Sequence, residues 1–289
     1  MAPLKRLTFK TNPAENRWVD ILRMWTDADA MDVLDGGYLF DHFYPIYGNP
    51  AGPCFEGWTA LSFLAGVTKR LRLGLMVTAV PYRHPALLAN MASTFDTFSG
   101  GRLDLGLGAG WMQQEAAEYG IPLLPIKQRL DQFEEAITVI DSMFRNETTT
   151  FDGVHYRLSG ARCEPKPLQK PRPPFVIGGL GEKRMLKICA RWADDWNFVG
   201  GPADMFRDKV EILHRHCETV GRDPASITLS SHVFASQGVE MAVMMSEALV
   251  AAGCQHLCLY FTDCSDPDAL GRTVEAVVQA VGKPVGKHG

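Results

Sequence analysis

The stretch Gly101-Arg102-Leu103-Asp104-Leu105-Gly106-Leu107-Gly108-Ala109-Gly110-Trp111 decides the fold. Its leucines predict a strand over residues 102–108, and a helix-like segment follows at residues 112–119. A strand that leads directly into a helix is typical of the βα units of a parallel sheet. Glycines at the strand end let a flat ring or a phosphate approach the backbone closely, although small residues also help a helix to pack on a strand. We therefore expect a ligand site at this strand end.

The same alternation of short apolar runs and longer amphipathic stretches extends along the whole chain. The predicted strands cover residues 6–10, 38–41, 71–79, 102–108, 175–178, 196–199, 227–233 and 256–261. The predicted helices cover residues 18–34, 57–70, 85–98, 126–144, 182–192, 204–220, 241–252 and 266–281. About eight such units in 289 residues fit one closed α/β barrel. The sequence thus predicts a single-domain (β/α)8 TIM barrel over residues 1–289.

Residues 148–174 interrupt this pattern because they are too rich in proline for a helix or a central strand. We expect an insertion loop at the barrel mouth. Long ordered loops of this kind often form lids or binding segments, and the alternative is a plain wrap over the surface.

The composition describes an ordinary globular protein with a small-molecule partner. Hydrophobic residues make up 46% of the chain and charged residues 21%, and the net charge is only −4. These values favour neither a nucleic-acid partner nor a membrane partner. Because no leader-like segment or apolar run of about 20 residues is present, we expect a cytoplasmic location.

The sequence favours no metal site. Its seven cysteines include no CxxC pair, which is typical of reduced, mostly buried thiols. A metal-dependent barrel hydrolase needs clustered ligands at strand ends, yet His42 has only Asp41 nearby in the sequence. His214 and His216 lie two residues apart on a predicted helix and therefore face different directions.

Two further strand ends carry residues that suit chemistry. Asp41 and His42 follow the second predicted strand, where a histidine can transfer protons and an aspartate can orient it; a structural cap is the alternative. The run Val176-Ile177-Gly178-Gly179-Leu180-Gly181-Glu182 leads a strand into a helix, and unpaired amides at a helix start bind anions such as phosphate. Glu182 should point away from such an anion.

A dinucleotide-binding loop is the main alternative for the glycines of residues 106–110. Their spacing is GxGxG instead of GxGxxG, and the next predicted strand begins only at residue 175. A Rossmann unit places its next strand much closer, so this assignment is weak.

Together these motifs resemble the bacterial luciferase-like superfamily, and most of all its oxidoreductases that depend on the deazaflavin coenzyme F420. The resemblance spans nearly the whole chain. The residues that carry the resemblance are 40–43, 82–88, 99–111, Glu115 with 119–122, 177–179 and 193–197.

The resemblance implies a cofactor ring across the barrel mouth. It implies that His42 is the active-site acid and that the third strand carries a non-prolyl cis peptide behind the ring. The cofactor contacts that it implies are Asp41, Val77, Thr78, Ala79, Gly108, Ala109, Gly110 and Gln114, with a phosphate turn at Gly178, Gly179 and Gly181. It also implies a homodimer.

Trp111 departs from the family pattern. Sugar-phosphate dehydrogenases of this group have a catalytic glutamate at this position. The indole argues against that substrate and favours an apolar or aromatic wall of the substrate pocket, or a packed residue.

The residues and the resemblance are compatible with three functions. The leading hypothesis is hydride transfer between F420 and a small organic substrate, with His42 moving the proton. The second is an FMN-dependent monooxygenase that receives electrons from a separate reductase. The third is a flavin-binding protein without turnover. The acidic tail of F420 would suit the cations Arg162, Lys166, Lys170, Arg172, Lys183 and Arg184, which equally fit a solvated face.

Overall fold

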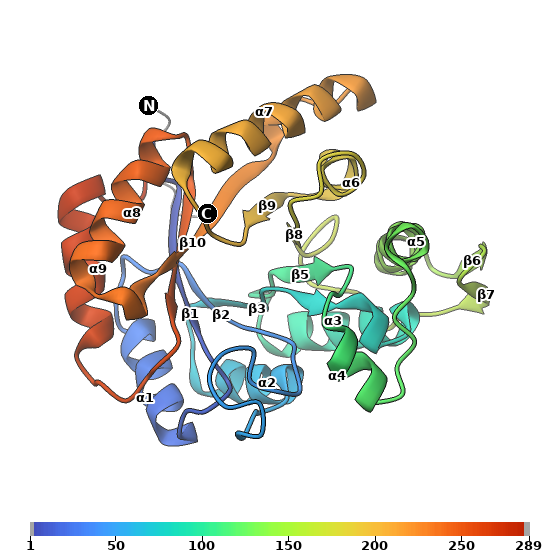
Figure 1. The fold of residues 1–289 in the computed structure, drawn as a ribbon. Helices are drawn as coiled ribbons and strands as arrows, with labels where there is room; N and C mark the ends of the chain where they lie inside the picture. The colour runs from blue at the N-terminus through green and yellow to red at the C-terminus, as the bar shows by residue number, and fades with distance from the viewer. Residues whose placement is uncertain (1–2, 286–289) are drawn as a thin grey trace.

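One parallel sheet closes on itself in the computed structural model, which describes residues 3–285 (Figure 1). Its nine strands run in the order β3-β2-β1-β11-β10-β9-β8-β5-β4. Because β3 and β4 are consecutive pieces of the chain, the two ends of this order meet and form a barrel. The strands are β1 (Arg6–Thr11), β2 (Gly36–Leu39), β3 (Arg72–Leu75), β4 (Thr78–Ala79), β5 (Leu105–Gly108), β8 (Phe175–Gly178), β9 (Asp195–Phe198), β10 (Thr228–Phe234) and β11 (His256–Phe261).

Helices cover the outside of the barrel, so the predicted single-domain (β/α)8 fold is confirmed (Figure 1). The helix α5 shows why they pack there, since its buried side chains recur at three- and four-residue spacing. None of the helices formed by residues 3–285 has the length and apolarity that a bilayer crossing needs. The helices are α1 (Trp18–Asp29), α2 (Gly57–Val67), α3 (Pro85–Phe98), α4 (Gln113–Glu118), α5 (Ile126–Arg145), α6 (Met185–Trp192), α7 (Ala203–Val220), α8 (Val239–Ala251) and α9 (Ala269–Val281).

One predicted helix boundary fails where a side chain satisfies backbone acceptors. The helix predicted over residues 18–34 ends at Asp29. The guanidinium of Arg70 donates to the carbonyls of Ala28, Met31 and Leu34, which satisfies acceptors that a longer helix would have used. The apolar pattern of residues 18–34 does not reveal an arginine that is distant in the sequence, so it predicts a helix that is too long.

The N-terminal end of the barrel is closed by a buried ionic cluster. The carboxylate of Asp104 accepts hydrogen bonds from Arg6 at 2.7 Å, from Arg72 at 2.5 Å and from the Tyr38 hydroxyl at 2.8 Å. Burial raises the pKa of Asp104, but the two guanidinium groups outweigh burial and hold this pKa well below its usual range. This cluster therefore fills the barrel interior near the N-terminal ends of β1, β3 and β5.

Residues 148–174 form a surface excursion. They contain the antiparallel hairpin of β6 (Thr149–Asp152) and β7 (Arg157–Ala161), which lies beside α5 (Figure 1). The proline-rich part then passes over α3, and Gln169 donates to Asp96 and to the carbonyl of Leu103 before β5. This path corresponds to the surface wrap considered above, because none of these residues lines the central cavity.

Candidate active site

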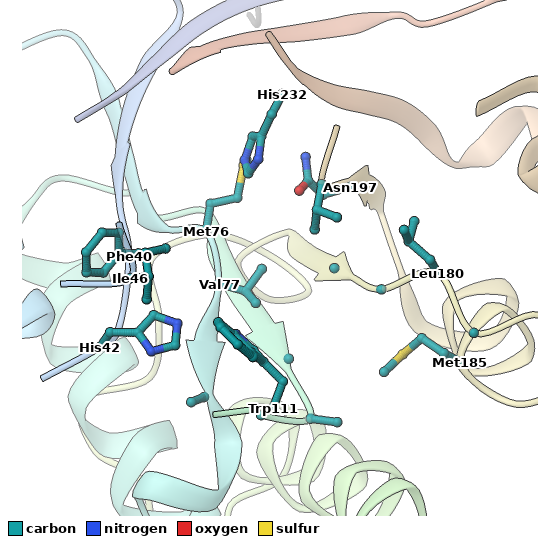
Figure 2. Close-up of a pocket in the computed structure, with 18 of the residues that line it drawn as sticks. Phe40, His42, Ile46, Met76, Val77, Trp111, Leu180, Met185, Asn197 and His232 are labelled. Atoms are coloured by element: carbon teal, nitrogen blue, oxygen red, sulfur yellow. The ribbon is translucent and has the colours of Figure 1, made fainter. Parts of the chain in front are cut away.

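A cavity of about 570 Å³ lies at the C-terminal ends of the barrel strands. Figure 2 shows side chains from opposite sides of the barrel pointing into one space. Most of the predicted site residues line it: His42, Val77, Ala79, Gly108, Ala109, Gly110, Trp111, Gly178, Gly179 and Gly181. The three strand ends predicted from the sequence therefore belong to a single site.

His42 is held at the cavity edge by a carboxylate from α4. Its Nδ1 lies 2.9 Å from Oε2 of Glu115, and the hydroxyl of Tyr82 donates to the same oxygen. The other oxygen of Glu115 accepts from the backbone amides of Phe43, at 2.5 Å, and Tyr44, at 3.1 Å. Glu115 is fully buried, so this carboxylate fixes both the imidazole and the chain that follows it.

The charge of Glu115 decides how His42 presents its ring. Burial raises the pKa of Glu115, but hydrogen bonds from His42, Tyr82 and Phe43 outweigh burial and lower this pKa below its ordinary value. An ionised carboxylate on Nδ1 keeps the proton of a neutral imidazole on that nitrogen. Nε2 is then free to accept a proton from, or return one to, a molecule in the cavity.

Asp41 does not reach the cavity, although it was predicted to contact a cofactor. Its buried carboxylate accepts from the amide of Ala79 at 2.9 Å and pairs with Arg83 at 2.7 and 3.0 Å. Arg83 bridges in turn to Glu56, which caps α2. Asp41 thus holds the backbone of β4 in position behind the site.

Two other predicted contacts also lie outside the cavity lining. Thr78 is fully buried between the neighbouring strands, and Ala79 after it lines the cavity instead. Gln114 is exposed on α4, where its amide donates to Glu118 one turn later. The helix therefore turns Gln114 outward and Glu115 inward.

The third barrel strand carries the expected non-prolyl cis peptide, between Met76 and Val77. This peptide lies between β3 and β4, and the side chain of Val77 points into the cavity (Figure 2). A Cβ atom on Gly108 would lie 2.5 Å from Cγ2 of Val77, and one on Gly106 would lie 1.8 Å from the carbonyl oxygen of Leu75. The glycines of β5 are thus required by the close approach of the third strand.

The turn after β8 fits an anion. The helix α6 that follows has no side-chain cap at its N-terminus within the described part of the chain, an arrangement that suits an anion. Arg129 of α5 lines the same part of the cavity, and its buried Nε has no hydrogen-bond partner among the described residues. Glu182 points away, as predicted, and pairs with Lys209 at 2.5 Å.

Sequence reasoning missed the polar residues that reach the cavity from other elements. Lys10, Asn197, His232 and Tyr260 project inward from β1, β9, β10 and β11, and Arg129 projects from α5. For the four strand residues, the signal in the sequence is a polar residue at an inward position of a predicted strand; Arg129 has no such signal. The cavity lining thus combines two cations and two histidines with no aspartate or glutamate among the described residues.

Trp111 lies at the entrance of the cavity. Its side chain is 62% exposed, and its ring packs edge-on against His42 with 5.5 Å between the ring centroids. This position agrees with a wall of the pocket, beside the imidazole (Figure 2).

The cations considered for an acidic tail lie outside the cavity lining. Arg172 is committed to Asp141 and Asp194, and Arg184 to Asp131. These ion pairs weaken the argument that the cluster serves a cofactor tail.

The fold and the site together define a TIM-barrel protein whose ligand cavity is bounded by a cis peptide, a glycine turn and a carboxylate-bound histidine. The chain belongs to the luciferase-like monooxygenase family, whose model matches residues 34–276. Members of this family are oxidoreductases and monooxygenases.

Both coenzyme types occur among similar proteins. An F420-dependent secondary alcohol dehydrogenase, solved with an F420-acetone adduct, superposes with a TM-score of 0.85 at 18% identity and covers 96% of this chain and 99% of its own. An FMNH2-dependent dimethylsulfone monooxygenase of Pseudomonas putida is 31% identical over 146 residues, which are 50% of this chain and 39% of that protein. An uncharacterized protein of Mycobacterium tuberculosis is 32% identical over 170 residues, 58% of each chain. The chain thus spans less than two thirds of the length of both curated relatives.

Proposed function

We propose that this protein transfers a hydride between the deazaflavin F420 and a small organic substrate. The observation that carries the proposal is the Glu115–His42 pair at the edge of an otherwise largely apolar cavity. A bound deazaflavin supplies or accepts the hydride. His42 then moves the accompanying proton through Nε2, so that a carbonyl and an alcohol interconvert with hydride and proton balanced.

The residues present fit the cofactor in two respects. Val77 forms a platform for a flat ring, because Gly108 leaves room for it. The glycine turn at Gly178, Gly179 and Gly181 suits the phosphate. So does the buried Nε of Arg129, which has no hydrogen-bond partner in residues 3–285. Asp41 supports the platform through the amide of Ala79.

Anaerobic reoxidation of reduced F420 tests the proposal. The protein is mixed with reduced F420 and a series of small ketones and aldehydes, and the returning absorbance of the oxidised cofactor is followed. We expect reoxidation that requires the protein and falls by about 100-fold or more in H42A. Equal rates in the wild type and H42A would remove His42 from proton transfer.

The second candidate is an FMN-dependent monooxygenase. The dimethylsulfone monooxygenase of Pseudomonas putida supports it, since that relative is FMNH2-dependent. This function requires a separate reductase and dioxygen, so turnover that depends on air and on reduced FMN would favour it. A non-catalytic flavin-binding protein is less supported, because such a protein has no need for an oriented imidazole.

A homodimer and a cytoplasmic location stay predictions. The dimer is supported by large apolar side chains that are exposed on α1, α2 and α3: Val19, Phe63, Val67, Leu87 and Phe98. Sedimentation equilibrium measures the mass in solution, and a monomer at micromolar concentration would contradict the dimer.

A further inference from the structure

Lys10 lies inside the barrel, on β1, and lines the cavity with almost no exposure. Its Nζ donates to the carbonyl oxygen of Met76 at 3.1 Å. The ammonium also lies 4.5 Å from the ring centroid of Tyr260, the residue directly beside it on β11, and 5.9 Å from that of Phe40. One carbonyl oxygen and two aromatic rings therefore contact the ammonium of Lys10.

No carboxylate compensates this buried charge. Among the described residues Lys10 forms no salt bridge, and the cavity lining contains no aspartate or glutamate. An ammonium without a counter-charge in a low-dielectric interior is costly, and a bound anion removes that cost. Burial lowers the pKa of Lys10 to about 8, so the side chain is mostly protonated at neutral pH and ready to accept such a partner.

The other titratable groups beside Lys10 stay uncharged around neutral pH. On β2, burial raises the pKa of Tyr38, the residue in register with Lys10, well above its usual value. On β11, burial raises the pKa of Cys258 to about 12 and raises that of Tyr260 further. On β10, burial and the charge of Lys10 lower the pKa of His232 well below its usual value. Lys10 is thus the group of this cluster that changes charge between about pH 7 and pH 10.

This cation is separate from the phosphate turn. In the closed barrel β1 lies across from β8: β11, β10 and β9 lie between them on one side, and β2, the β3–β4 strand and β5 on the other. Arg129 and the glycine turn line the β8 side of the cavity, and Lys10 lines the opposite wall. Phe40, Tyr260 and His232 surround the Lys10 end with flat rings.

We propose that Lys10 forms a second anion subsite, which binds the carboxylate of a small aromatic or aliphatic substrate while its apolar body lies between the rings of the cavity. This subsite would make small carboxylic acids the substrate class of the hydride transfer proposed above, and its catalytic role rests on that proposed function. A substrate carbonyl next to the carboxylate would then lie on the same side of the barrel as His42, since β1 and β2 are neighbours.

The test compares benzoate with benzamide, which has nearly the same shape without the charge. Affinities are measured by ligand-observed NMR titration on the full chain, both without cofactor and with saturating FMN. We expect wild-type protein at pH 7 to prefer benzoate by about tenfold, and K10M to lose this preference. The wild-type preference should decline as pH rises above about 8, because neutral Lys10 no longer attracts the anion.

Two control variants keep the result interpretable. K69M removes an exposed lysine and should bind benzoate like the wild type. K10R keeps the charge and should retain most of the preference, so it serves where K10M fails to fold. Equal benzoate affinity in the wild type and K10M would overturn the subsite. A K10M variant that binds FMN more weakly but benzoate normally would also overturn it, because Lys10 would then contact the cofactor ring. Because benzoate binding needs no cofactor, the subsite survives or fails independently of cofactor binding.

Discussion

The carboxylate of Glu115 lies 2.9 Å from Nδ1 of His42 and accepts a second hydrogen bond from the hydroxyl of Tyr82. The charge of this carboxylate stabilises the imidazolium that forms whenever Nε2 takes a proton. Glu115 is therefore a positioning residue. It lies on α4, the helix that follows the glycine-rich strand end.

Replacing Glu115 by glutamine should slow proton transfer without preventing folding. E115Q keeps the shape of the side chain but removes its charge, so we expect kcat to fall by about 10- to 100-fold with KM little changed. Steady-state kinetics of cofactor reoxidation measures this split. E118Q alters an exposed glutamate of the same helix and should have wild-type kinetics. A change in KM alone would mean that Glu115 acts in binding.

Asp104 should control stability toward acid. Its pKa is held below that of an unfolded aspartate by Arg6 and Arg72, so its contribution is fully present above about pH 4 and is lost as pH falls further. D104N leaves Arg6 buried without its partner and should cost about 3 to 5 kcal/mol of unfolding free energy at pH 7.

Urea unfolding at several pH values measures this difference. The gap between the wild type and D104N should narrow below about pH 4, because the unfolded wild-type chain then binds a proton on Asp104 that the native state does not bind. D152N breaks an exposed pair with Arg157 and should change stability by at most about 1 kcal/mol. A gap that is constant with pH would contradict the ionic origin.

Gly108 should resist a side chain because Val77 occupies the space beside it. G108A places a Cβ atom 2.5 Å from Cγ2 of Val77, so we expect a loss of about 1 to 3 kcal/mol and weaker cofactor binding. V77A should recover part of the stability in the double variant, which a double-mutant cycle detects. G66A fills open space in α2 and should be neutral or stabilising. Additive effects of G108A and V77A would show that the two sites are independent.

Arg129 should recognise the phosphate rather than the ring. FMN and riboflavin differ only in this group, so R129M should weaken FMN binding by about tenfold and leave riboflavin binding unchanged. Fluorescence titration of both flavins measures the two affinities. R207M removes an exposed arginine of α7 and should alter neither. Equal losses for FMN and riboflavin would place Arg129 elsewhere in the site.

The barrel and the strand ends could be predicted from the sequence because their signals are local. The apolar periods reveal each βα unit, and the turn at Gly178 and Gly179 lies directly after a strand. Gln114 and Asp41 are cofactor contacts by the family resemblance alone. A helix of six residues gives too little pattern to show that Glu115 faces inward and Gln114 outward. The pairing of Asp41 with Arg83 joins residues that are distant in the sequence, so no local signal reveals it.

The cations of the cavity could not be predicted for a related reason. Lys10 and Arg129 come from β1 and α5, far apart in the sequence, and each looks like an ordinary charged residue of its own element. Only the closed barrel brings them to one cavity, whose described lining contains no aspartate or glutamate. The role of these two cations depends on tertiary contacts, which the local sequence pattern does not show.

Equilibrium titration of the purified protein with F420 and with FMN, followed by cofactor fluorescence, tests the central claim most directly. The proposed function predicts saturable binding of F420 at about one site per chain with micromolar affinity, tighter than the binding of FMN. Tight binding of FMN alone would contradict the deazaflavin assignment, and binding of neither cofactor would contradict the proposed redox function.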